Sequence, residues 1–160
     1  MAILNKTLII GSGGYIGSRL SKEIQADGVD INWFKKGSKD IDFKDLTRDY
    51  YSQYNNIILL AGHSSVKMSE GNLNSCFNNN VRNFIDLLEK LDKQKLIYAS
   101  SSSVYGSVGG KTVNEKYFGF EPYNQYDISK HTADLYAQKS DVEYYALRFG
   151  TVNGCSPFLR

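Results

Sequence analysis

The sequence predicts an α/β fold, namely one doubly wound parallel sheet with helices on both faces. Short apolar runs such as 7–10 and 57–61 alternate with longer segments whose apolar residues recur at helical spacing. The 160 residues, of which 41% are hydrophobic and 22% charged, suit a single domain with a packed core. Such sheets bind ligands beyond the carboxyl ends of their strands, so the loops that follow the strands are the first places to search for a site.

Each element is predicted from its local pattern. We expect strands at 7–10, 29–34, 41–43, 57–61, 95–99 and 143–149, and helices at 15–26, 46–54, 81–91 and 123–139. The first helix carries Ile16, Leu20 and Ile24 four residues apart, and the dipeptide Asp27-Gly28 is expected to end it. Three loops at carboxyl ends of strands then remain, at 11–17, 62–74 and 100–121.

The charge and cysteine content exclude several classes of function. A net charge of +2, from 19 basic and 17 acidic residues, gives no reason to expect nucleic acid or an anionic membrane as a partner. The two cysteines, Cys76 and Cys155, form no metal-binding motif and are expected to be free thiols, so we expect no metal. The first apolar run is too short for a signal peptide or a membrane span. We therefore expect a soluble, cytoplasmic protein.

The loop at 11–17 is rich in glycine and stands between the first strand and the first helix. Glycine permits a tight turn and the close approach of a pyrophosphate to the backbone, and the helix behind it offers unpaired N–H groups. A glycine turn that merely precedes a helix is the alternative. The position after the first strand favours a dinucleotide site. Its residues are Gly11, Gly13, Gly14, Tyr15, Ile16 and Gly17.

Two further segments carry side chains suited to proton transfer. Tyr126 and Lys130 lie four residues apart, which places them one turn apart on one face of a helix. A nearby ammonium favours the phenolate and so lowers the pKa of a tyrosine. Ser101 ends a strand, where its hydroxyl and the phenol can share one substrate oxygen. The alternatives are a solvated helix surface for the tyrosine and lysine, and a flexible serine loop for 100–103.

Taken together, these motifs resemble those of the extended short-chain dehydrogenases of the NAD(P)-dependent nucleotide-sugar epimerase/dehydratase family. Within that family, they are most similar to the motifs of UDP-galactose 4-epimerase-like proteins. The resemblance covers nearly the whole chain. It implies an NAD(P)-binding Rossmann fold. The segments that carry it are Gly11-x-x-Gly14-x-x-Gly17, Leu60-Ala61-Gly62, Asn79-Asn80-Val81, Ser101 to Gly106, Tyr126-x-x-x-Lys130 and Leu147 to Gly154.

The resemblance also implies a role for each site residue. Tyr126 would be the general acid/base, Lys130 would bind the nicotinamide ribose and tune Tyr126, and Ser101 would be the catalytic hydroxyl, with Ser103 assisting. A hydride would pass between a sugar carbon and the nicotinamide. The remaining cofactor contacts would be Asp40 and Ile41 at the adenine, and Leu60, Ala61, Gly62, Asn80 and Ser100 elsewhere.

The family usually forms a homodimer. The resemblance therefore implies one here, through the helices at about 78–91 and 123–139, whose apolar stripes include Phe84, Leu88 and Leu135.

Departures from the family pattern narrow the expected chemistry. Where the family usually ends its second strand with an acid, this chain has Lys35, Lys36 and Ser38, which suit a 2′-phosphate, so we expect NADP rather than NAD. Solvated loop lysines are the alternative. Ser102 and Ser103 stand where 4,6-dehydratases carry acids, and the cysteine of 3,5-epimerase/reductases is missing. A 4-epimerase or a 4-keto reductase acting on a nucleotide sugar remains.

The family's substrate domain is missing from the 160 residues. We expect residues 1–160 to form a single dinucleotide-binding domain, as a fragment or as a short natural form. Two functions of different kinds then compete. The first is the cofactor domain of a nucleotide-sugar epimerase or reductase. The second is a catalytically silent NADP-binding module that serves as a sensor or an interaction protein.

Overall fold

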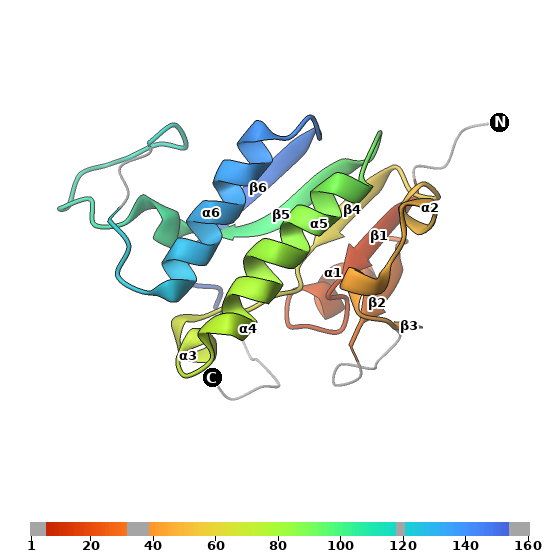
Figure 1. The fold of residues 1–160 in the computed structure, drawn as a ribbon, viewed down its shortest axis with the longest axis horizontal. Helices are drawn as coiled ribbons and strands as arrows, with labels where there is room; N and C mark the ends of the chain where they lie inside the picture. Colours follow the sequence, from red (N-terminus) through yellow and green to blue (C-terminus); the bar gives the residue numbers. More distant parts are fainter. Residues whose placement is uncertain (1–5, 32–38, 118–120, 154–160) are drawn as a thin grey trace.

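In the computed structural model, which describes residues 6–31, 39–117 and 121–153, six strands form one fully parallel sheet (Figure 1). Their order across the sheet is β3-β2-β1-β4-β5-β6, the order of a Rossmann fold. This confirms the doubly wound α/β fold. The strands are β1 (Thr7–Ile10), β2 (Asp27–Asp30), β3 (Lys39–Asp40), β4 (Asn56–Leu59), β5 (Lys95–Ser101) and β6 (Tyr144–Phe149).

The helices pack against the sheet in two layers. The long helices α5 and α6 cover one face in Figure 1, while the opposite winding of the chain from β1 to β2 puts α1 on the other face. None of the helices in the described ranges is long and apolar enough to cross a membrane. The helices are α1 (Gly17–Glu23), α2 (Arg48–Tyr51), α3 (Val66–Ser69), α4 (Leu73–Phe77), α5 (Asn83–Lys90) and α6 (Gln125–Lys139).

Three short segments have other helical geometries. The 3₁₀ turns are η2 (Phe43–Asp45) and η4 (Ser102–Tyr105), and η3 (Asn78–Arg82) is one turn of π-helix between α4 and α5. A π turn accommodates one more residue than an α turn and is frequent at functional sites. The continuous helix expected at 81–91 thus begins inside this turn, and its α-helical part starts only at Asn83.

The main hydrophobic core lies between the sheet and the layer of α2, α5 and α6. Alternate residues of β1, β4 and β5 enter it, because side chains of a strand point to opposite faces in turn. Phe84 and Leu88 of α5 belong to this core, with exposures of 2% and 7%. Their expected place in a dimer interface is therefore wrong, since the stripe they form faces the sheet. Leu135 is 42% exposed, as an interface residue would be.

Strand boundaries differ from expectation mainly around β2 and β3. Asp27 and Gly28, expected to end a helix, belong to β2 and pair with Leu8 and Ile9 of β1. Pairing with a central strand outweighs the local turn signal, and α1 ends at Glu23. The third strand occupies Lys39–Asp40 rather than 41–43, because Phe43 begins η2. The predicted strand residues 32–34 lie outside the described part of the chain.

The glycine at the end of β1 provides a test of the packing. Gly11 has φ +86°, and a Cβ on it would lie 2.6 Å from the Ala61 nitrogen. Gly71 has a similar φ of +77° but no heavy atom within 4 Å of its Cβ position. Gly71→Ala should lower the free energy of unfolding by about 1–2 kcal/mol through its backbone conformation alone. Gly11→Ala should cost at least about 2 kcal/mol more, because the clash adds to that strain.

Urea unfolding of the two variants measures both costs. Equal losses of stability in Gly11→Ala and Gly71→Ala would contradict the close packing of the glycine loop against the loop after β4.

Candidate functional site

The glycine loop lies beyond the carboxyl end of β1 and folds tightly on itself. The Gly14 N–H donates to the Gly11 carbonyl at 3.2 Å, and the Gly11 N–H donates to the Val29 carbonyl at 2.9 Å. A Cβ on Gly17 would lie 2.1 Å from the Gly11 carbonyl oxygen, so the start of α1 is pressed against the turn. The turn is thus closely packed, and a side chain on Gly11 or Gly17 would collide with backbone atoms.

A carboxylate that sequence reasoning missed borders this loop. Asp30 ends β2, its Oδ2 accepts a hydrogen bond from the Gly13 N–H at 2.8 Å, and its Oδ1 accepts from the Ile31 N–H. Partial burial raises the pKa of this carboxyl, and the backbone N–H bonds act in the opposite direction. Asp30 lies nineteen positions after Gly11, a spacing at which dinucleotide folds carry a ribose-binding acid. It was missed because β2 was expected to end four residues later.

The predicted adenine contacts lie beside Asp30. Asp40 pairs with Asp30 across β2 and β3, and the Ile41 N–H donates to the Asp30 carbonyl at 2.9 Å. Asp40 is exposed and Ile41 partly buried. The expected phosphate contacts Lys35, Lys36 and Ser38 lie outside the described residues.

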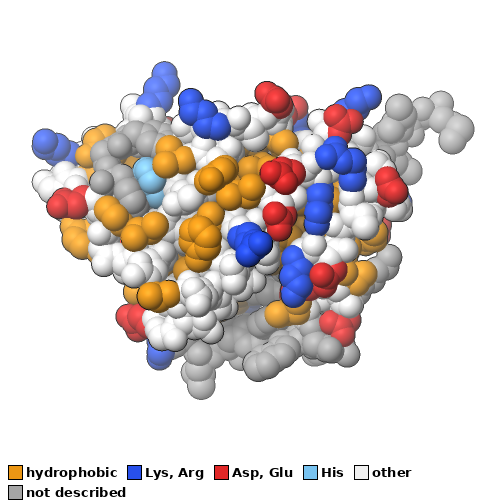
Figure 2. Space-filling view, viewed as in Figure 1, with side chains coloured by type: hydrophobic (Ala, Val, Ile, Leu, Met, Phe, Trp, Pro, Cys, Tyr) orange, Lys and Arg blue, Asp and Glu red, His pale blue; other side chains and the backbone are white. Residues whose placement is uncertain are grey.

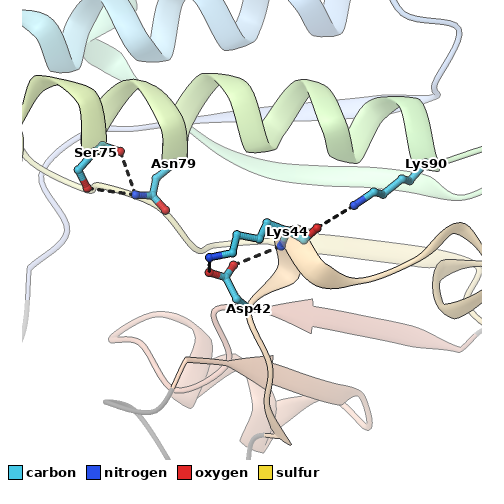
Figure 3. A network of polar contacts seen from close by, with 5 residues as sticks. All are labelled: Asp42, Lys44, Ser75, Asn79 and Lys90. Atoms are coloured by element: carbon cyan, nitrogen blue, oxygen red, sulfur yellow. Dashed lines mark hydrogen bonds and ion pairs between the residues drawn. The ribbon is translucent and has the colours of Figure 1, made fainter.

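Two groups of polar contacts lie near η2 (Figure 3): one joins η2 to α5, and the other joins η3 to α4. Asp42 caps η2 by accepting from the Lys44 N–H at 3.2 Å and pairs with the Lys44 ammonium at 3.0 Å. Lys90 donates to the Lys44 carbonyl, and Asn79 donates to Ser75. An open cavity of about 540 Å³ separates η2 from the α4 side, and these contacts fix its walls.

The loop after β4 approaches the glycine loop closely. The Leu60 N–H donates to the Ile10 carbonyl at 2.8 Å, which continues the β1–β4 ladder into the loop. Gly62 adopts φ +132°, and a Cβ there would lie 2.6 Å from the Asn80 Oδ1. Leu60 and Ala61 thus lie at backbone contact distance from the glycine loop, and Gly62 lies against Asn80.

The end of β5 supplies the serines. Ser101 accepts a hydrogen bond from the Ser103 N–H at 3.1 Å, which caps η4. That bond uses one lone pair of the hydroxyl, whose O–H stays a donor. Among the described residues, the buried Oγ atoms of Ser100 and Ser103 have no hydrogen-bond partner. Buried hydroxyls of this kind usually have a partner, so two at one strand end suit a polar ligand.

Capping at the start of α6 sets the position of Tyr126. Asn124 accepts from the Asp127 N–H at 3.0 Å, and Asp127 accepts in return from the Tyr123 N–H and the Asn124 side chain. These reciprocal bonds cap the helix, which begins at Gln125. Tyr126 then lies in the first turn, 9% exposed.

Lys130 joins that turn to the sheet. Its Nζ donates to the Ala99 carbonyl at 2.9 Å and lies 5.8 Å from the centre of the Tyr126 ring. Burial lowers the pKa of the Lys130 ammonium to about 8, while the charge of Asp134 acts in the opposite direction. Since Ala99 precedes Ser100 and Ser101 on β5, the structure brings the expected Ser–Tyr–Lys residues to one end of the sheet.

A buried ion pair lies one turn behind Lys130. Asp134, 2% exposed, accepts from the Tyr98 hydroxyl at 2.7 Å and from the Arg148 Nε at 3.1 Å. Arg148 also lies 4.9 Å from the centre of the Tyr105 ring and donates to the Glu115 carbonyl. This cluster ties α6 to β5, β6 and the long loop after η4. No motif in the sequence pointed to it.

The remaining predicted residues are Tyr15 and Ile16, which follow the first glycines of the loop. The Tyr15 hydroxyl donates to the Asn153 carbonyl at 3.2 Å, so the glycine loop contacts the segment after β6, and the Arg19 guanidinium lies 4.0 Å from the centre of the Tyr15 ring. Ile16 precedes α1. Within residues 6–31, 39–117 and 121–153, no group of three or more His, Cys, Asp and Glu side chains is placed to hold a metal ion.

The lowered pKa of Lys130 predicts a pH dependence. Below about pH 8 the lysine is charged in both the folded and the unfolded chain, so the full cost of burying the charge is present. Between pH 8 and 10.5 the folded chain loses this proton while the unfolded chain keeps it, so the lysine's contribution to the free energy of unfolding rises with pH. From pH 7 to pH 10 the wild type should gain about 2 kcal/mol relative to Lys130→Met.

Denaturant unfolding at several pH values measures this difference, with Lys139→Met as the matched control at an exposed position of the same helix. Parallel pH profiles for the wild type and Lys130→Met would contradict a buried ammonium at this site.

Comparison with known proteins extends these findings. The sequence matches the model of the NAD dependent epimerase/dehydratase family over residues 7–159. Protein CapI of Staphylococcus aureus is 29% identical over 93% of this chain and 54% of its own length. A UDP-glucose 4-epimerase of Lacticaseibacillus casei is 27% identical over 93% of this chain and 52% of its own. The chain thus spans about half the length of these curated relatives.

Solved structures show the same relation. MoeE5 in complex with UDP-glucose and NAD superposes with a TM-score of 0.80 at 26% identity, over 93% of this chain and 55% of that one. A UDP-glucose 4-epimerase structure superposes with a TM-score of 0.77 at 28% identity, over 96% of this chain and 54% of that one. Because the family model matches residues 7–159, the chain belongs to the NAD-dependent epimerase/dehydratase family.

Proposed function

We propose that this chain is the dinucleotide-binding domain of a cytoplasmic nucleotide-sugar 4-epimerase or 4-keto reductase. One observation carries the proposal. Lys130 is held between the Ala99 carbonyl and the Tyr126 ring, at the strand end where Ser101 also lies. A phenol, an ammonium and a hydroxyl that share one strand end form the donor set that proton transfer at a sugar hydroxyl requires.

Each of the three side chains has a distinct role in the proposal. Tyr126 takes the proton from the sugar hydroxyl, or returns it, because its phenol is the group that can hold or lose a proton there. The Lys130 ammonium stabilises the phenolate electrostatically and donates to a ribose hydroxyl. Ser101 donates its O–H to the same sugar oxygen, which orients the hydroxyl toward the phenol. A bound nicotinamide would supply or accept the hydride.

A tight glycine turn before a helix suits a dinucleotide, because glycine lets a pyrophosphate approach the backbone and the helix offers unpaired N–H groups. In this turn a side chain on Gly11 or Gly17 would collide with backbone atoms. The unpartnered Ser100 and Ser103 hydroxyls support a polar ligand beside it. The family resemblance adds Ala61, Gly62, Asp40 and Ile41 as further contacts. The serines also argue against a dehydratase, because Ser102 and Ser103 offer no carboxyl group for the elimination of water.

The choice of dinucleotide depends on charge at the end of β2. The carboxylate of Asp30 accepts hydrogen bonds and would accept them from the two ribose hydroxyls of NAD, whereas it would repel a 2′-phosphate. We therefore propose NAD as the cofactor. The sequence analysis instead led us to expect NADP. That competing choice is supported by the basic residues Lys35 and Lys36 and by Ser38.

Fluorescence titration with NADH and NADPH distinguishes the two. NADH should bind more tightly, and Asp30→Ala should weaken it by about tenfold or more, the loss expected for hydrogen bonds to a charged group. Asp49→Ala removes an exposed carboxylate of α2 as a control. Tighter binding of NADPH that is lost in a Lys35→Ala, Lys36→Ala double variant would overturn the choice of NAD.

The catalytic assignment has its own test. In a preparation that turns over a UDP-sugar, the substrate class named for MoeE5 and the epimerases, Tyr126→Phe should lower hydride transfer by about 10²–10⁴-fold with little change in NADH affinity. Ser101→Ala should lower turnover in the same way, and Lys130→Ala should weaken both. Single-turnover absorbance of the reduced nicotinamide measures the step. A fully active Tyr126→Phe variant would refute the assignment of Tyr126 as the general acid/base.

We also propose a homodimer through the face formed by α4 and α6. Hydrophobic side chains gather over these helices in Figure 2. Leu73 and Phe77 of α4 are each 54% exposed, and Ile128 and Leu135 of α6 are each 42% exposed. Each pair recurs at helical spacing and so lies on one face of its helix, and the two helices contact each other. A patch of this kind suits a second copy, because isologous interfaces bury the same surface twice.

Sedimentation velocity measures the association. The wild type should sediment as a dimer at micromolar concentration, and a Phe77→Glu, Leu135→Glu double variant as a monomer. Tyr145→Glu changes an exposed apolar residue of β6, away from this face, and should leave the dimer intact. A monomeric wild type, or a dimer lost only in Tyr145→Glu, would contradict the proposed interface.

A further inference from the structure

We infer that Asn80 is a positioning residue that fixes the loop after β4 to the helix that carries Tyr126 and Lys130. The inference rests on the proposed function for its catalytic meaning and on the hydrogen bonds of Asn80 for its geometry. This one side chain would hold the loop after β4, a part of the proposed dinucleotide site, at a fixed position relative to the proton-transfer residues.

The amide of Asn80 reaches both parts of the crevice. Its Oδ1 accepts from the His63 N–H at 2.8 Å, and its Nδ2 donates to the His63 carbonyl at 3.1 Å, so both backbone groups of one loop residue are held. The same Nδ2 donates to the Ser129 Oγ at 3.0 Å, and Ser129 donates in turn to the Tyr126 carbonyl at 2.8 Å. The chain of contacts thus runs from the β4 loop to the first turn of α6.

These bonds occupy the donors of the side chain. A carboxamide has two N–H donors, and both point to protein acceptors here. Asn80 is 5% exposed and Ser129 is 2% exposed, and the Cys76 thiol lies 3.7 Å from the Ser129 Oγ. We expected Asn80 to line the cofactor from the family resemblance. That cofactor contact stays a prediction, and the hydrogen bonds of Asn80 point to an additional role that acts through the residues it holds.

Two backbone features make this reach possible. Asn80 lies in the π turn η3, where the altered pitch turns both Asn80 and Val81 inward, with exposures of 5% and 1%. At the other end, Gly62 lacks the Cβ that would lie 2.6 Å from the Asn80 Oδ1. Only glycine at this position lets the loop come close enough for the His63 N–H to reach the amide.

A double-mutant cycle of Asn80→Ala and Ser129→Ala tests the inference, with native-state hydrogen exchange and NADH affinity as readouts. Asn78→Ala is the matched control, because Asn78 occupies the same π turn with an exposed side chain. In Asn80→Ala, exchange should rise about tenfold both at the His63 amide and in the first turn of α6, as expected for the loss of a buried hydrogen bond. Asn78→Ala should change neither segment.

The affinity for NADH should fall by about tenfold in Asn80→Ala, and the double variant should bind no more weakly than Asn80→Ala alone, because both changes break one connection. A Ser129→Ala variant that raises exchange in the β4 loop would show transmission from α6, even where Asn80→Ala does not fold. Exchange confined to one segment, additive effects, or an unchanged NADH affinity in folded Asn80→Ala would overturn the inference. If the wild type binds no dinucleotide, the proposed function is refuted instead. Hydrogen exchange then still tests whether Asn80 connects the loop after β4 to the first turn of α6.

Discussion

The arrangement of the site depends on the hydrogen bonds that the buried carboxylate of Asp134 accepts. Its two oxygens are bound by Tyr98 of β5 and Arg148 of β6, so one side chain of α6 is tied to both strands beneath it. Burial and the neighbouring carboxylate both raise the pKa of the Tyr98 phenol, which therefore stays a neutral donor. Removing one partner of a buried pair leaves a charge without compensation, typically at about 3–5 kcal/mol. Because Lys130 stands one turn before Asp134, the same contact determines where the ammonium meets β5.

The opposite wall of the crevice is fixed by steric contact rather than by charge. The glycine loop and the loop after β4 meet at Gly11, where a Cβ would collide with the backbone of Leu60 and Ala61, and Gly62 leaves room for the Asn80 amide. Asn80 then holds the second loop against α6 by hydrogen bonds. Charge and hydrogen bonding thus place the proton-transfer residues, whereas close packing places the dinucleotide cradle, and one asparagine joins the two.

Much of this could be predicted from the sequence, and the failures share one cause. Periodicity placed β1, β4, β5, α6 and β6 well, and the four-residue spacing of Tyr126 and Lys130 placed both on one helix face. Asp30 was missed because the boundary of β2 is set by pairing with β1, which no local pattern records. The Asp134 cluster joins residues from three elements, so only the folded chain brings them together. Phe84 and Leu88 formed a clear stripe, but a stripe does not tell which neighbour it will face.

The close approach of Gly11 to Ala61 also limits how such a protein can be recombined. The two loops are far apart in the sequence and come from separate strand–helix units, yet the backbone of Leu60 and Ala61 occupies the space that a side chain on Gly11 would need. Exchanging residues 11–17 alone with those of a distant relative would place foreign backbone against an unmatched partner. Chimeras, and gene conversion in nature, should therefore succeed when the segment through residue 62 moves as one block. The glycine loop and the loop after β4 are therefore expected to change together in evolution.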